Sequence, residues 1–153
     1  MAGFTTAMPN SFKVEILKAV HNFTASTGNT FKLALGKATA SVTGTYGAAT
    51  TSYDQLVSNS DELANGNGYA TGGATLTSIT PVLDSSTAVC DFDNYTWTSA
   101  TFTTSGGIID NDTASGNPAC AILSFGGDQQ VSSGDFQIQF PAAAAATAII
   151  RIA

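Results

Sequence analysis

Apolar residues alternate with polar or small residues along much of the chain after residue 30, and this two-residue period constrains the fold most strongly. Residues 135–141, "DFQIQFP", place Phe136, Ile138 and Phe140 on one face of an extended chain and two glutamines on the other. Such alternation is typical of a strand with one buried face. Residues 30–37, "TFKLALGK", alternate in the same way and predict a buried face of Phe31, Leu33 and Leu35 and a wet face of Lys32, Ala34 and Gly36. Similar segments recur at spacings of roughly 8–12 residues between Gly-, Ser- and Asn-rich turns. We therefore expect a mainly β protein, an antiparallel β-sandwich or jelly roll.

A helical period appears only near the N-terminus. Residues 9–23, "PNSFKVEILKAVHNF", carry an apolar stripe at helical spacing that runs from Phe12 to Phe23. The proline that opens this segment, with Asn10 or Ser11 as N-cap, is a helix start signal. We predict one N-terminal α-helix that ends before residues 24–29.

The remaining segments follow from local composition. Residues 1–8 lack periodicity and are interpreted as an N-terminal arm ahead of a single domain, residues 9–153. Residues 38–75 are rich in Gly, Thr, Ser and Asn, with a short helix or turn expected around residues 60–65. The glycines and serines of residues 126–134 predict a turn. The last residues are expected to form a loop that leads into a terminal strand.

The low charge of the chain limits its partners. Charged residues make up 10% of the chain, against about a quarter in ordinary soluble domains. The net charge of -6 divides into +3 up to Lys37 and -9 after it. We expect no nucleic-acid partner, because binding phosphates takes clustered Lys and Arg. Low charge also weakens the repulsion between neighbouring molecules, which suits a subunit of an assembly.

No segment predicts export or membrane insertion. No apolar run approaches the length of a membrane span, and the first residues lack the pattern of a signal peptide. We expect a protein that is made in the cytoplasm and has no membrane partner. Cys90 and Cys120 lie in apparent strands and are predicted to be free, buried thiols.

Candidate catalytic and metal-binding residues are few. His21 is the only histidine, no G-x-S-x-G motif accompanies it, and we interpret it as a solvated or helix-capping side chain. One histidine and two distant cysteines do not have the spacing of a zinc site. Residues 66–73, "GNGYATGG", lack the Lys-Ser/Thr of a phosphate-binding loop and are interpreted as a turn. We therefore expect no cofactor and no catalytic residue.

The stretch from residue 91 to 112 raises two further alternatives. Asp91 and Asp93 share one strand face, which is compatible with glycosidase chemistry or a calcium site. No glycine-turned loop with a distal glutamate follows, so we interpret both as solvent-facing acids, with Phe92 pointing to the core. Trp97 is predicted to pack in the core or in an interface.

Four segments resemble a family of small structural proteins from tailed bacteriophages. They are "NSFK…H.FT.STG.TFK.AL" in residues 10–35, "G.GY..GGATL" in 66–76, "V.DF…TWTSAT.T..G" in 89–107 and "G.F.IQFP…IIRIA" in 134–153. The resemblance is collinear and covers most of the chain. It implies a virion structural protein, most simply a capsid decoration (cement) protein, and it supplies no catalytic residue.

Together these features predict a non-enzymatic decoration protein on the outer surface of a phage capsid. The expected partners are the major capsid protein and further copies of the chain, as a homodimer or homotrimer. The predicted contact residues are Phe4 in the arm and Tyr46, Tyr53 and Tyr69 in the segment 38–75.

Two other classes remain open. A tail or fibre component would contact the host surface and bind glycan through Tyr69, Tyr95 and Trp97. A carbohydrate-active enzyme would use Asp91 and Asp93.

Overall fold

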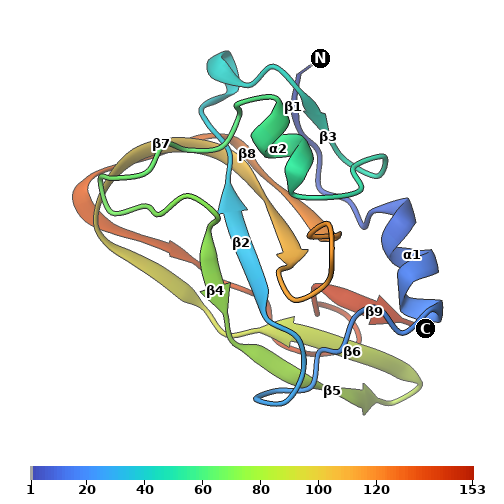
Figure 1. Cartoon of the computed structure of the whole chain (residues 1–153). Coiled ribbons are helices and arrows are strands. Elements are labelled where there is room, and N and C mark those ends of the chain that lie inside the picture. The colour runs from blue at the N-terminus through green and yellow to red at the C-terminus, as the bar shows by residue number, and fades with distance from the viewer. Residues whose placement is uncertain (1) are drawn as a thin grey trace.

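The computed structural model describes residues 2–153 (Figure 1). It is 47% strand and 11% helix, which confirms the mainly β class and the N-terminal helix. Within residues 2–153 the elements are, in order, β1 (Gly3–Phe4), α1 (Asn10–Leu17), β2 (Phe31–Leu35), the 3₁₀ turn η1 (Thr39–Ser41), β3 (Thr45–Tyr46), α2 (Asp54–Ser58), β4 (Ala74–Leu76), β5 (Ser78–Asp84), β6 (Thr87–Phe92), β7 (Tyr95–Asn111), β8 (Ala119–Ile138) and β9 (Ile150–Ile152). The described strands form the antiparallel sheets β4-β2-β7-β8 and β5-β6-β9 and the small parallel sheet β1-β3.

Strand β2 lies inside the larger sheet, between β4 and β7. Phe31, Leu33 and Leu35 are fully buried on one face, as their alternation predicts. The prediction that the other face is wet is wrong at Ala34, which is also fully buried. A second apolar cluster that includes Leu56 of α2 covers that face. The centre of this sheet is therefore buried on both sides.

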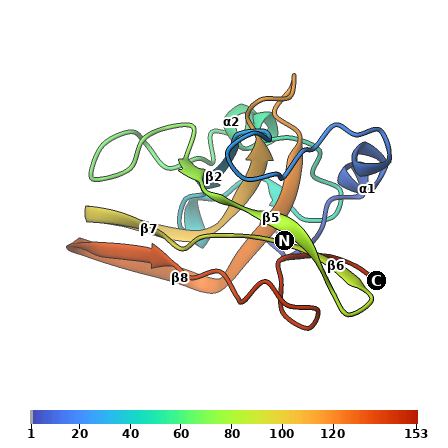
Figure 2. The same ribbon diagram turned by 90° about the horizontal axis from the view of Figure 1, so that it is seen from below.

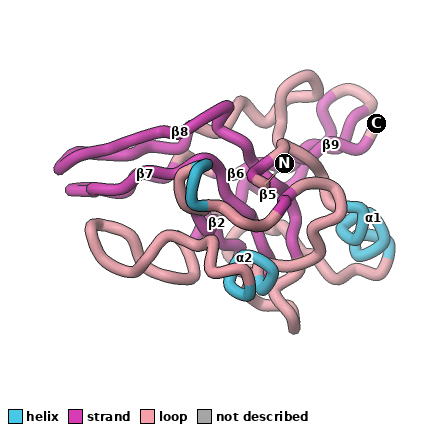
Figure 3. The backbone as a smooth tube through the Cα atoms, turned by 90° about the horizontal axis from the view of Figure 1, so that it is seen from above, coloured by secondary structure: helices cyan, strands magenta, loops and turns pink. Residues whose placement is uncertain are grey.

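Strands β7 and β8 are much longer than the sequence predicts. They pair from Tyr95 with Ile138 to Asp110 with Ala119, and the predicted turn at residues 126–134 lies inside β8. Several register shifts interrupt the pairing, and Gly126 and Gly127 have positive φ angles. Bulges of this kind let two long strands bend together without ending. Figures 2 and 3 show β7 and β8 running side by side away from the body, on the side opposite α1.

The second antiparallel sheet shares the main core with the first. Phe92 of β6 and Ile150 of β9 belong to the same buried cluster as Leu33 and Trp97. The expected loop after Pro141 and the strand at the end of the chain are confirmed by β9, which pairs with β6.

Helix α1 ends earlier than its apolar stripe predicts. The amide of Val20 donates to the carbonyl of Glu15, and that of Ala19 donates to the carbonyl of Ile16. Ala19 has φ 57°, so these bonds form a Schellman cap with alanine at the left-handed position. Glycine usually marks such an end, and its absence hides this one from the sequence. At the other end Pro9 occupies the N-cap position and no side chain caps the helix, so the N-cap prediction is wrong.

The segment 2–8 packs against the rest of the chain. β1 pairs in parallel with β3, and Ala7 bridges Ile122 of β8. The Phe4 ring occupies a slot where a methyl group on Gly36 or Gly106 would overlap it. The two glycines thus make room for an aromatic ring contributed by the arm.

The segment 38–75 is more ordered than its composition predicts. It contains η1, β3, α2 and β4, and Ser52 bridges Pro118 at the end of the β7–β8 pair. The short helix or turn expected around residues 60–65 is not a helix, because the helix of this segment, α2, ends at Ser58 and a turn follows at residues 59–60.

The Phe4 slot predicts that Gly36→Ala destabilises the protein. The added methyl group must displace the Phe4 ring, and overpacking of this kind typically costs about 1–3 kcal/mol. Gly47→Ala is the matched control, because a methyl group there would meet only Thr5, at 3.8 Å. The free energy of unfolding from urea titrations measures both effects, and Gly47→Ala should stay within about 0.5 kcal/mol of wild type.

A double-mutant cycle isolates the contact. In a Phe4→Ala background the Gly36→Ala change should cost much less, because no ring occupies the slot. An equal cost in both backgrounds would show that the ring does not fill this slot.

Candidate interaction surface and buried polar clusters

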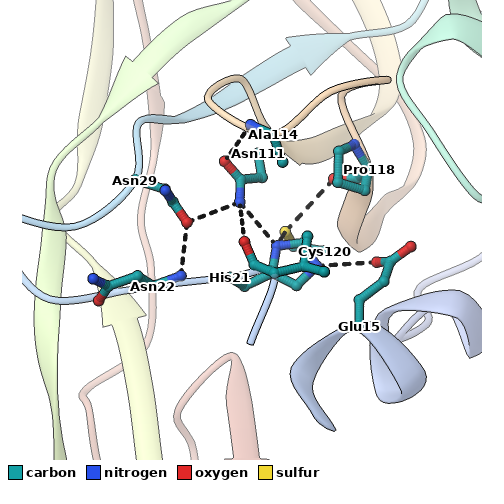
Figure 4. Close-up of polar contacts among 9 residues, drawn as sticks. Glu15, His21, Asn22, Asn29, Asn111, Ala114, Pro118 and Cys120 are labelled. Carbon is teal, nitrogen blue, oxygen red and sulfur yellow. Dashed lines mark hydrogen bonds and ion pairs between the residues drawn. The ribbon is translucent and has the colours of Figure 1, made fainter. Parts of the chain in front are cut away.

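The side chain of Asn111 is the centre of a buried polar cluster (Figure 4). It is fully buried at the end of β7. Its amide nitrogen lies 3.3 Å from the carbonyl oxygen of Val20, 3.1 Å from Oδ1 of Asn29 and 3.1 Å from Nδ1 of His21. Its Oδ1 accepts the backbone amides of residues 113 and 114. One side chain thus connects the end of α1, the turn before β2 and the turn between β7 and β8.

His21 is an interior residue of this cluster. Its exposed fraction is 9%, so the prediction of a solvated or helix-capping histidine is wrong. Nε2 lies 3.0 Å from Oε2 of Glu15, and the ring of Phe12 lies 4.9 Å away, centroid to centroid. Because Nδ1 accepts a hydrogen bond from Asn111, the network assigns the proton to Nε2, which donates to Glu15. The early end of α1 places His21 after the helix, where its ring turns inward.

The same cluster contains Cys120, whose Sγ lies 3.6 Å from Nδ1 of His21. Thiol, imidazole and the Glu15 carboxylate have the order of a nucleophile, a base and an orienting acid. However, Cys120 is fully buried, and burial, together with the charges of Asp110 and Glu15, raises its pKa well above the ordinary value. The thiol therefore stays protonated and out of reach of a substrate, so this cluster serves packing. Cys90 and Cys120 are both free and buried, as predicted.

A second buried cluster forms around Glu62. Its carboxylate accepts hydrogen bonds from the hydroxyls of Tyr53, at 2.6 Å, and Tyr69, at 2.8 Å, and from the amide of Gly72, at 2.6 Å. Burial and the neighbouring Glu62 raise the pKa of both tyrosines, so both remain donors. These bonds tie α2 and the turn before β4 to a single carboxylate.

Asp61, the preceding residue, forms a third cluster on its own. It is fully buried and accepts from the Tyr46 hydroxyl at 2.7 Å, the Gly44 amide at 2.7 Å and the Thr43 amide at 2.9 Å. Burial opposes its charge, but these donors outweigh burial and lower the pKa of Asp61. The segment 38–75 thus folds around two buried carboxylates, which its Gly-, Thr-, Ser- and Asn-rich composition did not predict.

The four predicted contact residues have different places in these clusters. Phe4 stacks on Tyr46, with ring centroids 4.8 Å apart, and Tyr53 packs against the same apolar cluster. Tyr69 belongs to the main core, beside Trp97. Tyr46 and Tyr69 are only 1% and 3% exposed, whereas Phe4 and Tyr53 are half-buried. Phe4 and Tyr53 therefore keep some surface for a partner, and the contact role of all four stays a prediction.

The side chains of Asp91 and Asp93 differ in burial. Asp93 is exposed, but Asp91 is fully buried and accepts the amides of Phe92 and Ile149, so its prediction as a solvent-facing acid is wrong. The segment that leads into β9 covers this part of β6, which the local alternation could not reveal. Trp97 is 5% exposed, which confirms its burial.

Asp110 is a further buried acid, near the end of β7. It is 2% exposed, and its Oδ1 has no hydrogen-bond partner among the described residues. Burial raises the pKa of Asp110 to about 8. Asp112 and Glu62 act in the same direction, and Lys32 opposes them. Asp110 is therefore neutral below about pH 8.

No group of three or more His, Cys, Asp or Glu side chains among residues 2–153 is placed to hold a metal ion. No helix in this range is long and apolar enough to cross a membrane.

Large apolar side chains are exposed around α1 and the second antiparallel sheet. Leu17 is 88% exposed, Leu83 71%, Ile152 55%, Val82 53% and Val14 51%. Two apolar hollows open among them, of about 210 Å³ between α1 and β9 and about 170 Å³ over β6 and β9. Exposed apolar surface gathered in one region is typical of a binding surface.

No protein-family model, curated protein or solved structure matches this chain.

Replacement of Asn111 by alanine should destabilise the protein strongly. It leaves buried backbone and side-chain groups without partners, and each such group typically costs about 1–3 kcal/mol. We expect a loss of about 3 kcal/mol in urea unfolding and faster amide exchange in residues 111–118. Asn65→Ala, at an exposed position, is the matched control and should change little. A similar small effect for both variants would contradict a central role of Asn111.

Stability should fall as pH rises toward 8 because of Asp110. An unfolded aspartate ionises near pH 4, whereas the folded Asp110 stays protonated up to about pH 8. The unfolded state therefore binds fewer protons in this window, and stability decreases with pH. The free energy of unfolding of Asp110→Asn, minus that of wild type, should be larger at pH 8 than at pH 5. Urea unfolding at both pH values measures this difference. Asp93→Asn, at an exposed acid, should show no such trend. Parallel profiles for wild type and Asp110→Asn would contradict this assignment.

Proposed function

We propose that the chain is a non-enzymatic virion structural protein of a tailed bacteriophage. The observation that carries this assignment is the resemblance of four segments to a family of small structural proteins from tailed bacteriophages. The segments are collinear and comprise residues 10–35, 66–76, 89–107 and 134–153. Many residues of the pattern are structural, since Phe31, Tyr69, Phe92 and Trp97 belong to the main core. The pattern therefore describes the framework of the fold and not a local motif.

Within a virion, the chain would act as a capsid decoration (cement) protein on the outer surface of the head, where it stabilises contacts between capsomers. The exposed apolar side chains around α1, β5 and β9 support a binding role, because a solitary soluble protein rarely gathers such residues in one region. The low share of charged residues supports the same role.

The mechanism is mass action. A protein that binds only the assembled shell stabilises that shell by an amount that grows with its concentration relative to its dissociation constant. Its partners would be the major capsid protein and further copies of itself, as a homodimer or homotrimer. Weak contacts repeated on one particle add through effective concentration. The protein would be made in the host cytoplasm and act on the virion surface, and it would need no cofactor.

We also propose that the fold is a variant of the β-sandwich. The sheets β4-β2-β7-β8 and β5-β6-β9 contribute side chains to one core, as the two layers of a sandwich do.

Localisation on the particle tests the function. Antibody labelling or a density map of virions that carry the chain should place it on the outside of the head. Purified chain added to heads that lack it should bind to saturation and raise their thermal stability. Isolated tails from the same preparation are the control and should bind none. Label on the tail or fibre would favour the alternative role in host contact, and absence from purified virions would exclude both.

A further inference from the structure

A continuous apolar groove lies between α1 and β9. One hollow is lined by Met8, Phe12, Ile16, Leu17 and Ile152, and the second by Ile16, Pro81, Ala88, Ile150 and Ile152. The two hollows share Ile16 and Ile152, so they form one surface, which we call the α1–β9 groove. Figure 1 shows α1 beside β9 and the C-terminus. Each hollow is smaller than the roughly 300 Å³ of typical small-molecule pockets, and its size suits single side chains.

Strand β9 has one open edge beside this groove. In the sheet order β5-β6-β9 it is terminal, and its ladder pairs only with β6 among the described residues. The open edge of a strand presents backbone amides and carbonyls that can pair with an added strand.

Cationic side chains lie close to the groove in a chain that is negative overall. Lys13 lines one hollow, and Lys18 directly follows Leu17, which lines the same hollow. Arg151 points to the opposite face of β9 from Ile150 and Ile152, and its guanidinium donates to the carbonyls of Ala145 and Ala146. The ion pairs among the described residues are His21 with Glu15 and Lys32 with Asp112. Neither the two lysines nor Arg151 therefore has an ion-pair partner among the described residues, although the net charge of the chain is -6.

We propose that the α1–β9 groove binds an extended, acidic segment of a different protein chain. The segment adds a strand to the open edge of β9, its apolar side chains enter the two hollows, and its carboxylates approach Lys13, Lys18 and Arg151. This inference rests on the proposed function, in which such a segment belongs to a neighbouring protein of the virion.

Charge argues against a second copy of this chain as the occupant. A symmetric pairing of β9 with β9 of another copy would bring the lysines and Arg151 of both copies together. The other edge strand of this sheet, β5, contains Pro81, which has no backbone amide to donate. An acidic segment from another chain meets neither obstacle.

Peptide binding in solution tests the inference without a virion. The probe is a fluorescein-labelled nine-residue peptide in which Asp or Glu alternates with Ile or Val. The control peptide has Lys at every acidic position. Fluorescence anisotropy with the purified full chain at low salt should detect binding of the acidic peptide only, and binding should weaken as salt is added.

Variants locate the binding site. Leu17→Gln and Ile152→Thr should each weaken binding of the acidic peptide, and together by tenfold or more, about 1.4 kcal/mol. Val57→Gln is the matched control, because Val57 is 49% exposed on α2, away from the groove, and it should leave binding unchanged. The double variant Lys13→Glu with Lys18→Glu should lose the acidic peptide and gain the lysine peptide. This exchange of preference cannot arise from unfolding.

Three results would overturn the inference. They are the absence of binding at millimolar peptide, equal binding of both peptides, and binding that the groove variants leave unchanged. Sedimentation of the chain alone supplies a further check, since self-association abolished by Leu17→Gln would make a second copy the occupant. Each of these results leaves the capsid role open, because virion localisation tests that role separately.

Discussion

The pairing of β7 with β8 is the constraint on which the rest of the structure depends. This ladder runs from Tyr95 and Ile138 to Asp110 and Ala119, and it continues through β2 to β4 on the other side. The arm reaches it through Ala7 and the segment 38–75 through Ser52. The paired residues of this ladder are close in the sequence at one end, where Asp110 pairs with Ala119 across the turn at residues 112–118. Pairing can therefore begin at this turn, and segments distant in the sequence can then pack on the ladder.

Buried polar side chains hold these distant segments in place. Asn111 joins the end of α1 to the turn between β7 and β8, while Asp61 and Glu62 organise the segment 38–75. Each carboxylate receives several donors, which compensates for the loss of water around it. Although the chain has few charged residues, two of its acids are buried and connect segments of the fold through hydrogen bonds. Asp110 differs from Asp61, because its Oδ1 lacks a donor and its pKa is raised to about 8, whereas the pKa of Asp61 is lowered.

The surface follows from the same arrangement. Tyr46 and Tyr69 are used inside the chain, and all the large exposed apolar side chains of the described residues except Val57 lie on α1, β5 and β9. Both tyrosines were predicted as contact residues because they lie in the segment 38–75, whose composition is typical of a loop. Composition does not show which tyrosine hydroxyls donate to a buried carboxylate. Leu17 could have been noticed, because it lies outside the stripe of Phe12 and Ile16 on the helix. The open edge of β9 could not be predicted from the sequence, because the order of strands in a sheet is decided only when the sheets assemble.

The sequence by itself determined what depends on near neighbours: the mainly β class, the presence of an N-terminal helix, the alternation in β2 and in residues 135–141, the free thiols and the burial of Trp97. These features need only the local period of apolar residues and the ordinary preferences of each residue type. Tertiary structure decided the rest. It carried β8 through a glycine-rich stretch, buried Ala34 and Asp91 on faces expected to be wet, and enclosed His21 with Cys120. In each case a segment distant in the sequence supplied the hydrogen bonds or the covering surface, and the energy of that contact exceeded the local preference.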